Sequence, residues 1–250
     1  MTLRAPVESL CAGERELELG PSRYLVLVRR LRAGARFVAF DPARGLEADA
    51  ELLVADPRRA LVRFGPPRAG RVTAPLPVTL LWSLGKGDKP EAVIRDATAL
   101  GAAAVVLVTT ARSVPRLSER AEERRERWLT VAREAARQSG RGDVPTVVGP
   151  LGLADALVFA RDSAGVVLDP EARTHLARAL GDWRPPAPLR VLIGPEGGLT
   201  PGELSEARAA GFVAASFGRL TLRTETAVVA VLGALVALAD REGGSPPDPI

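Results

Sequence analysis

The sequence predicts an α/β protein in which a small β-rich domain precedes a larger domain with a parallel sheet. Short runs of strand-forming residues occupy the first 74 residues. From about residue 75 onward, apolar strands alternate with helical segments, which is the pattern of βαβ units. The stretch Gly65–Gly70, rich in glycine and proline, separates the two parts. We therefore expect domains over residues 1–74 and 75–242, followed by a disordered tail over residues 243–250.

The composition is that of a globular chain in a reducing compartment. Its 250 residues are 46% hydrophobic and 26% charged, which disfavours disordered, collagenous and membrane classes. One cysteine, Cys11, excludes an internal disulfide framework, and with one histidine, His175, it leaves no Cys/His zinc cluster. The longest apolar run, residues 227–239, is shorter than the ~20 residues that span a bilayer, and the N-terminus lacks the apolar region of a signal peptide. We expect a cytoplasmic protein with no metal and no membrane partner.

The first domain combines short strands with an excess of arginine. Runs of strand-forming residues lie at 24–28, 35–40, 50–54 and 60–64, and such spacing favours a small barrel or sandwich. This part holds 13 arginines and nine acidic residues, whereas the rest of the chain holds 21 basic and 21 acidic residues. The whole formal charge of +4 therefore falls on the first domain. This is the pattern expected of a surface that binds nucleic-acid phosphates, with chance and genomic base composition as the alternative explanation.

The second domain reads as a series of buried strands with helices between them. The predicted strands are residues 78–82, 104–108, 144–148, 165–168 and 189–193, and the predicted helices include residues 88–100 and 119–138. His175, which a histidine-based catalytic triad would require, is predicted to lie within a helix as a surface or packing residue, and this interpretation is favoured over a triad. The chain contains no P-loop, no GxGxxG after a strand and no GxSxG elbow.

The strongest local signal lies between Leu192 and Glu203. A buried strand runs into a turn with three glycines, and a helix then begins with Thr200 as its N-cap, Pro201 at its first position and Glu203 closing a capping box. Glycines let a ligand approach the main chain, and open α/β sheets bind ligands beyond the carboxyl ends of their strands. The segment predicts a ligand-binding loop, with a purely structural turn as the alternative.

The second signal lies between residues 212 and 227. A strand is predicted to begin at Phe212 and to end at Gly218, and a helix is predicted to begin at the capping residue Thr224. Arg219 and Arg223 lie beside this helix N-terminus, where a phosphate or a carboxylate is favoured. An ordinary capped helix start is the alternative interpretation.

These two segments together resemble a known family. The motifs Gly194-Pro195-Glu196-Gly197-Gly198 and Leu222-Arg223-Thr224-Glu225-Thr226-Ala227 are similar to the signature of the RsmE-type ribosomal RNA uridine-N3 methyltransferases, a branch of the SPOUT superfamily. Further similar segments follow in order along nearly the whole chain: residues 23–30, 86–89 with 99–101, and 135–141 with 144–145.

The resemblance implies a fold and a cofactor. The expected fold is a C-terminal SPOUT α/β trefoil-knot domain with a parallel sheet, preceded by a PUA-like RNA-binding β-barrel. The expected cofactor is S-adenosyl-L-methionine, held largely by the backbone of three loops, in a homodimer formed through the C-terminal domain. The cofactor-binding residues carried over are Leu168, Ile193, Gly194, Pro195, Glu196, Gly197, Gly198, Phe217, Gly218, Leu220, Leu222 and Thr226.

The activity that the resemblance implies is methylation of N3 of one uridine in small-subunit (16S) ribosomal RNA, with that RNA or the small subunit as partner. We expect Arg223 to orient the base or to stabilise its negative charge, and Glu196 or Glu225 to act as base or to orient the cofactor. The expected RNA-binding residues are Arg23, Arg30, Lys86, Lys89, Arg141, Arg219 and Arg223. A methyltransferase acting on another RNA, such as a transfer RNA, and a non-enzymatic ribosome-assembly factor are the alternatives.

Four positions depart from the family pattern. Ala99 and Arg137 stand where the family usually has glutamate, and Tyr24 stands where a histidine is common. Arg219 directly follows Gly218, and Leu220 occupies the usual position of an arginine. This shift leaves open which side chain at that turn reaches the RNA or the cofactor.

Overall fold

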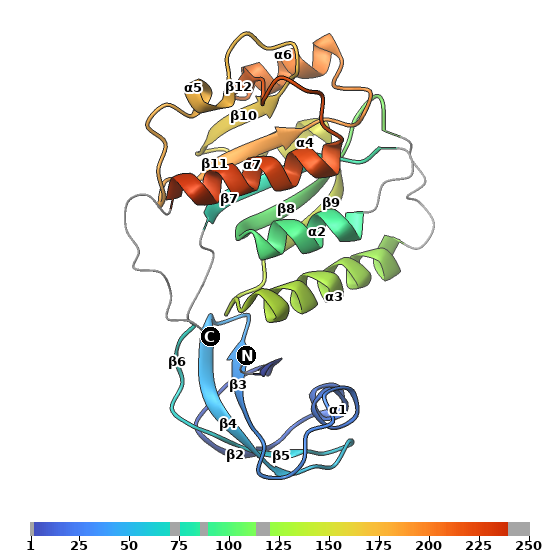
Figure 1. Cartoon of the computed structure of the whole chain (residues 1–250). Coiled ribbons are helices and arrows are strands. Elements are labelled where there is room, and N and C mark those ends of the chain that lie inside the picture. The colour runs from blue at the N-terminus through green and yellow to red at the C-terminus, as the bar shows by residue number, and fades with distance from the viewer. Residues whose placement is uncertain (1–2, 71–75, 86–89, 114–120, 240–250) are drawn as a thin grey trace. The chain divides into compact units, whose positions relative to one another are not determined.

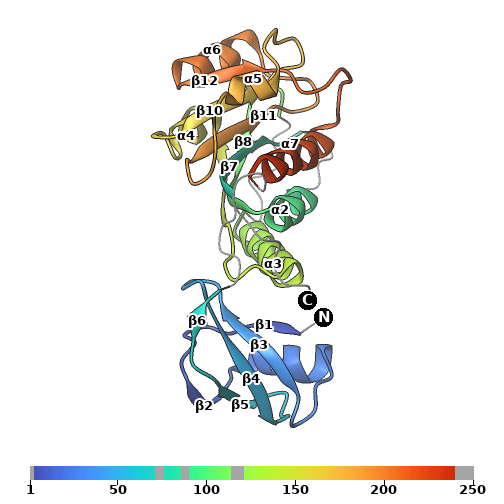
Figure 2. The same ribbon diagram turned by 60° about the vertical axis from the view of Figure 1, so that its left-hand side comes forward.

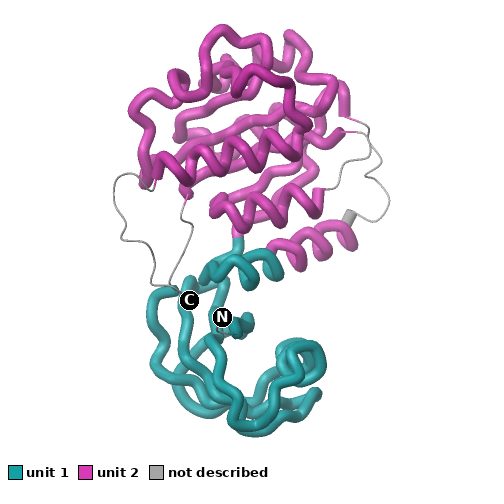
Figure 3. The backbone as a smooth tube through the Cα atoms, in the orientation of Figure 1, with its two compact units in different colours: residues 1–73, 133–144, 247–250 teal, residues 74–132, 145–246 magenta. Residues whose placement is uncertain are grey.

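The computed structural model describes residues 3–70, 76–85, 90–113 and 121–239, so the predicted tail over 243–250 lies outside the described residues. The described residues divide into two compact units (Figure 3). The first unit comprises residues 3–70 and 133–144, and the second comprises the remainder. Residues 133–144 thus pack with the β-rich unit although more than sixty residues of chain separate them from it. The domain bounds 1–74 and 75–242 stay a prediction.

The first unit is built on one sheet of six strands. Its order is β1-β3-β4-β5-β2, with β6 paired to β4; β1 runs parallel to β3 and the other pairs are antiparallel. The strands are β1 (Arg4–Pro6), β2 (Gly13–Glu16), β3 (Arg36–Asp41), β4 (Leu46–Val54), β5 (Leu61–Phe64) and β6 (Arg68–Ala69). The strands predicted near residues 35–40, 50–54 and 60–64 are confirmed.

The strand predicted over residues 24–28 is wrong. These residues form η1 (Tyr24–Val28), a π-helical segment that continues directly from α1 (Leu19–Arg23). Each residue added to an existing helix gains one hydrogen bond without a new nucleation cost. This gain outweighs the weak strand preference of a five-residue apolar run. In this helical form Leu25 is fully buried while Leu27 and Val28 are exposed.

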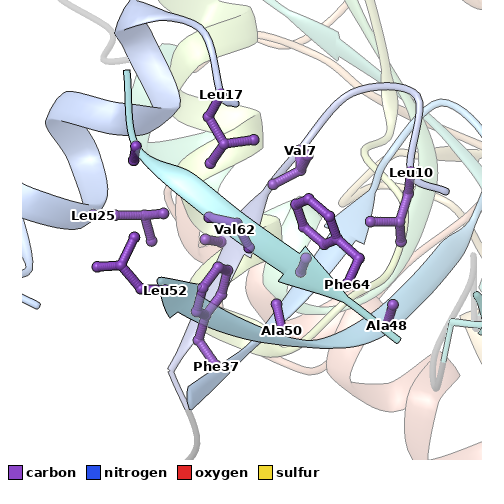
Figure 4. Close-up of a cluster of buried hydrophobic side chains, with 13 residues drawn as sticks. Val7, Leu10, Leu17, Leu25, Phe37, Ala48, Ala50, Leu52, Val62 and Phe64 are labelled. Carbon is purple, nitrogen blue, oxygen red and sulfur yellow. The ribbon is translucent and has the colours of Figure 1, made fainter. Parts of the chain in front are cut away.

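The core of the first unit collects apolar side chains from both its sheet and its helical segment (Figure 4). Phe37 on β3, Leu52 on β4 and Val62 on β5 are buried together with Leu25 from η1. Leu17, just before α1, joins the same cluster. Burial of Leu25 therefore fixes the segment that carries the arginines near residue 30.

The second unit is built on a sheet of six parallel strands, as predicted (Figure 1). The strand order is β12-β10-β11-β7-β8-β9. The strands are β7 (Leu76–Ser83), β8 (Ala102–Thr109), β9 (Thr146–Gly152), β10 (Ala164–Leu168), β11 (Leu189–Ile193) and β12 (Phe212–Ala215). The predicted α/β class is confirmed, whereas the knotted path of the chain stays a prediction.

Helices cover both faces of this sheet, with α2 and α7 on one face and α4 on the other (Figure 2). The helices of the unit are α2 (Pro90–Ala99), α4 (Leu153–Val158), α5 (Leu176–Leu180), α6 (Pro201–Ala209) and α7 (Thr224–Ala239), and α3 (Ala121–Ser139) runs from this unit into the first. Leu157 from α4 and Ala207 from α6 pack with Leu81, Val106 and Leu192 of the sheet. Burial on both faces explains the continuous apolar run of β8.

One buried arginine ties several segments together at the amino end of β11. The side chain of Arg190 donates hydrogen bonds to the carbonyl oxygens of Leu157 (2.7 Å), Ser163 (2.9 and 3.2 Å) and Ala210 (3.2 Å). Its guanidinium also lies over the ring of Phe212, 4.4 Å from the centroid. Burial lowers the pKa of Arg190, yet a guanidinium stays charged at any ordinary pH. Arg190 therefore binds the end of α4, the turn before β10 and the end of α6 at once.

Candidate functional site

A pocket of about 190 Å³ lies at the carboxyl ends of β10, β11 and β12, which are neighbours in the sheet. This is the edge at which open α/β sheets bind ligands. Three segments of the second unit form its walls, together with the first turn of α7. The lining residues are Leu168, Asp169, Pro170, Ile193, Gly194, Pro195, Glu196, Gly198, Ala215, Ser216, Phe217, Gly218, Arg219, Leu220, Thr221, Leu222, Thr224 and Ala227.

The glycine-rich loop after β11 forms the first wall. A Cβ atom at Gly194 would lie 3.0 Å from the side chain of Leu199, so a larger residue here would require Leu199 to shift. Gly198 has a φ of +70° and donates its N–H to the carbonyl of Pro195 at 2.7 Å, which closes the turn. The predicted capping box then starts α6: Thr200 accepts the N–H of Glu203, and Glu203 accepts the N–H of Thr200. The turn and the capped helix fix the path of the loop past the pocket.

Gly197 lies on the opposite side of the same loop. It is absent from the described lining residues, whereas Gly194, Glu196 and Gly198 belong to them. Arg112, from the loop after β8, donates a hydrogen bond to the carbonyl of Gly197. The structure thus places Gly197, a predicted cofactor residue, behind the pocket wall.

The segment between β12 and α7 forms the second wall. Gly218 has a φ of +72°, and the exposed residues Arg219, Leu220 and Thr221 follow it. The side chain of Leu220 is 80% exposed, more than any other exposed large hydrophobic residue described. Both residues of the departure noted in the sequence, Arg219 and Leu220, therefore line the open side of the pocket.

The third wall follows β10. The Asp169 N–H donates to the carbonyl of Ala215 at 3.0 Å, which joins this wall to the second one. Ser216, which lines the pocket, lies with its Oγ 3.1 Å from Nδ1 of His175. The prediction that His175 lies within a helix is wrong: it directly precedes α5 and pairs with Ser216, because the chain there runs beside β12.

The predicted catalytic residues gather at the start of α7 and at the glycine-rich loop. Glu196 is exposed and lines the pocket. The Arg223 side chain is exposed, and the carbonyl of Arg223 accepts the N–H of Ala227 at 2.8 Å, so Arg223 holds the capping position predicted for Thr224. Glu225 is half-buried and accepts the Thr224 hydroxyl at 3.3 Å. Arg223, Glu225 and Thr226 flank the pocket in sequence, outside its lining residues.

The predicted RNA-binding residues fall into three groups. Arg23 and Arg30 are exposed on the first unit, and Arg219 is exposed on the second. Lys86 and Lys89 lie outside the described residues. Arg141 is buried and bound to Asp143 at 2.8 and 2.9 Å, so the prediction that it binds RNA is wrong: its guanidinium is turned into the protein.

Several lining residues were absent from the sequence prediction. They are Asp169, Pro170, Ala215, Ser216, Thr221, Thr224 and Ala227. Most of them adjoin a predicted residue at the carboxyl end of β10 or β12. The rule that ligands bind beyond strand ends, applied to whole segments, would have included them.

The part of the chain that the structure describes holds no cluster of three or more histidine, cysteine, aspartate or glutamate side chains placed to bind a metal ion. None of its helices combines the length and the apolar character needed to cross a membrane.

Two family models match the chain. The model for an RNA methyltransferase domain matches residues 72–236, and the model for an RNA methyltransferase PUA domain matches residues 22–65. A ribosomal RNA small subunit methyltransferase E from Mycobacterium bovis is 33% identical over 228 residues, covering 88% of this chain and 85% of that protein. A protein of the same name from Bacillus subtilis is 34% identical over 168 residues, 64% of this chain and 66% of that protein.

Two solved structures are similar over nearly the full length. A ribosomal RNA small subunit methyltransferase E from Neisseria gonorrhoeae, bound to S-adenosyl methionine, is 31% identical with a TM-score of 0.84 and covers 95% of this chain and 98% of that one. A Legionella pneumophila protein in complex with bound SAM is 26% identical with a TM-score of 0.85, over 96% of this chain and 98% of that one.

Proposed function

This chain belongs to the RNA methyltransferase family, and on that basis we propose that it transfers a methyl group from S-adenosylmethionine to N3 of one uridine in small-subunit ribosomal RNA, in the cytoplasm. One observation carries the proposal. The chain has a pocket at the carboxyl ends of β10, β11 and β12, and 95% of the chain matches the structure of a relative bound to S-adenosyl methionine.

The residues of the pocket fit this cofactor. Leu168, Ile193 and Leu222 supply apolar walls suited to an adenine ring. Gly218 lines the pocket, and a Cβ atom there would meet open space, so a ligand can approach its backbone closely. The carboxylates of Asp169 and Glu196 lie among the lining residues and would attract the positively charged sulfonium group.

The start of α7 is suited to the acceptor base. When bound, S-adenosylmethionine supplies an activated methyl group on a positive sulfur and leaves as S-adenosylhomocysteine. N3 of uridine must lose its proton before its electron pair can bond to the methyl carbon, and a nearby positive charge favours the deprotonated base. The exposed guanidinium of Arg223 and the N-terminus of α7 both supply such charge. Glu196 or Glu225 takes the proton or orients the reactants.

Methyl transfer to small ribosomal subunits by single variants tests these roles. Arg223→Ala should lose nearly all transfer while folding and S-adenosylmethionine binding persist. Near-normal turnover in Arg223→Ala would show that Arg223 has no catalytic role. Glu196→Gln and Glu225→Gln identify the base: the substitution that removes it should lower kcat by about 10²- to 10⁴-fold. Arg208→Ala, on the exposed face of α6, serves as control.

The first unit carries a cluster of arginines suited to RNA phosphates. We call Arg23, Arg29, Arg30, Arg32 and Arg36 the arginine cluster; all five are exposed, and none of their side chains has a hydrogen bond or ion pair to another described residue. Backbone strain occurs within it, because Arg30 adopts a φ of +54°.

Arginines on the strands of the same unit are occupied instead. Arg63 pairs with Glu14 and Glu51, and Arg68 pairs with Glu47 and Asp49. The formal excess of charge in this part of the chain is thereby concentrated on residues 23–36. We expect this cluster, rather than the strands, to hold the RNA.

The exposed side of α7 is suited to a second copy of the chain. No charged residue occurs between Thr226 and Ala239. Val229 is 42% exposed, and a Cβ at Gly233 would meet open space. Glycine inside a helix costs about 1 kcal/mol relative to alanine. Its presence at a position that no other described side chain approaches fits close approach by a partner helix. A homodimer formed here should dissociate in Gly233→Arg, measured by sedimentation; an unchanged dimer would place the interface elsewhere.

A further inference from the structure

The side of the glycine-rich loop that faces away from the pocket is bound to the loop that follows β8. The loop after β8 begins with a tight turn. The N–H of Thr110 donates to the Ser113 hydroxyl, and the N–H of Ser113 donates to the Thr110 carbonyl, both at 2.9 Å. We propose that Arg112 and Glu203 are positioning residues that hold the glycine-rich loop in the conformation that binds S-adenosylmethionine. The proposal rests on the proposed function, because it assigns the pocket to that cofactor.

Glu203 provides the first tie. Its Oε2 atom accepts the N–H of Thr200 at 2.7 Å, as a capping box requires, and also accepts the Thr200 hydroxyl at 3.0 Å. Its Oε1 atom accepts the N–H of Ala111, 92 residues earlier in the chain, at 2.7 Å. Capping of α6 does not need this second bond. Because Glu203 is buried, its charge-assisted bonds are stronger than bonds between neutral groups.

Arg112 provides the second tie. Its guanidinium donates to the carbonyl of Gly197, and its Cδ atom would lie 3.2 Å from a Cβ atom at Gly197. The arginine stem therefore lies directly on the glycine. Neither Arg112 nor Gly197 belongs to the described lining of the pocket, so the contact is made from behind the wall.

The two ties act on the flexibility of the loop. Three glycines in five residues give the free loop many accessible conformations. When only a fraction of molecules has the binding conformation, the apparent Kd rises by the inverse of that fraction. Removing a tie should lower this fraction. It should leave the bound complex unaltered, because neither side chain lines the pocket, so affinity should fall while kcat at saturating cofactor is kept.

Calorimetry with S-adenosylmethionine on the full chain tests the proposal. Arg112→Met should raise Kd about five- to tenfold, as expected when the competent fraction falls to about a fifth or a tenth, with kcat at saturating cofactor within about twofold. Glu203→Gln should also raise Kd, because an amide cannot accept both backbone N–H groups. Arg208→Met and Glu206→Gln, exposed side chains on α6, are the matched controls and should bind as the wild type does.

Arg112 is exposed, so its variant keeps the test valid even if Glu203→Gln fails to fold. An unchanged Kd in Arg112→Met, a fall in kcat at unchanged Kd, or an equal loss in Arg208→Met would each overturn the positioning role. A wild-type chain that does not bind S-adenosylmethionine would overturn the proposed function and this proposal with it. Normal binding by both the wild type and Arg112→Met would overturn the positioning role alone.

Discussion

The guanidinium of Arg137 lies over the ring of Tyr24, with its carbon 5.1 Å from the ring centroid. Tyr24 begins η1, Arg137 lies in the last turns of α3, and both belong to the first unit. Each occupies a position at which the resemblance predicts a departure from the usual family residue. The two departures form one contact, in which Arg137 is also held by Glu134 at 3.0 Å.

The Tyr24–Arg137 contact should contribute measurably to stability. Because Tyr24 is half-buried, the cation–π attraction is only partly screened by water. We expect the free-energy changes of Tyr24→Leu and Arg137→Met to be coupled by about 0.5–1 kcal/mol in a double-mutant cycle measured by urea unfolding. Arg133→Met, an exposed arginine on the same helix, should show no coupling to Tyr24→Leu. If the free-energy changes of Tyr24→Leu and Arg137→Met simply add, the contact does not stabilise the protein.

Arg190 should be among the most sensitive positions for stability. Its removal leaves the carbonyl groups of Leu157, Ser163 and Ala210 without their donor. A buried polar group left without its partner costs about 1–3 kcal/mol, and three carbonyl groups lose a donor here, so Arg190→Met should lower the urea midpoint strongly. Arg190→Lys should recover only a small part, because an ammonium group cannot span the separated carbonyls. A loss below about 1 kcal/mol would show that the three bonds contribute little.

The stabilising effect of Glu203 should depend on pH. Burial raises its pKa, but hydrogen bonds from Ala111 and Thr200 outweigh that effect, and the pKa lies below its ordinary value. A carboxyl whose pKa is lowered by folding stabilises the protein above its unfolded pKa, and this stabilisation disappears as the pH falls through the lowered pKa. The difference in unfolding free energy between wild type and Glu203→Gln should therefore be full near neutral pH and shrink below about pH 4. Glu206→Gln should show no such trend.

Salt dependence distinguishes the arginine cluster from the paired arginines. Replacing Arg29, Arg30, Arg32 and Arg36 with glutamine should lower the slope of log K against log salt by about 3 for ribosomal RNA, since each phosphate contact contributes about 0.7–0.9. Arg63→Gln removes a cation already paired with Glu14 and Glu51, and should change the slope by less than about 1. Filter binding across a salt series measures both slopes. An equal change of slope in the four-arginine variant and in Arg63→Gln would show that the arginine cluster is not the RNA-binding surface.

The parallel sheet was predictable from the sequence because its strands are buried on both faces. Runs such as Ala104–Val108 and Leu189–Ile193 are buried along their whole length, and the capping residues Thr200 and Glu203 mark the following helix start directly. Composition failed where the structure depended on interactions outside the segment itself. Tyr24–Val28 has strand-forming composition, yet a helix already begun at Leu19 continues through it.

The functional residues show the same limit. Asp143 lies only two residues from Arg141, but the burial of the Arg141 guanidinium depends on packing that the local sequence pattern does not show. The bond between Arg112 and Gly197 joins residues 85 positions apart, and no local spacing predicts it. Residues of the pocket itself were more accessible to prediction, because strand ends and glycine turns carry a local signal.

The central claim is methylation of N3 of a uridine in small-subunit ribosomal RNA, and mass-spectrometric mapping of that RNA tests it most directly. Cells lacking the protein should lose a single 3-methyluridine, which the wild-type chain restores and Arg223→Ala does not. An unchanged pattern of ribosomal RNA methylation, with a methyl group lost from a transfer RNA or from no RNA at all, would contradict the account.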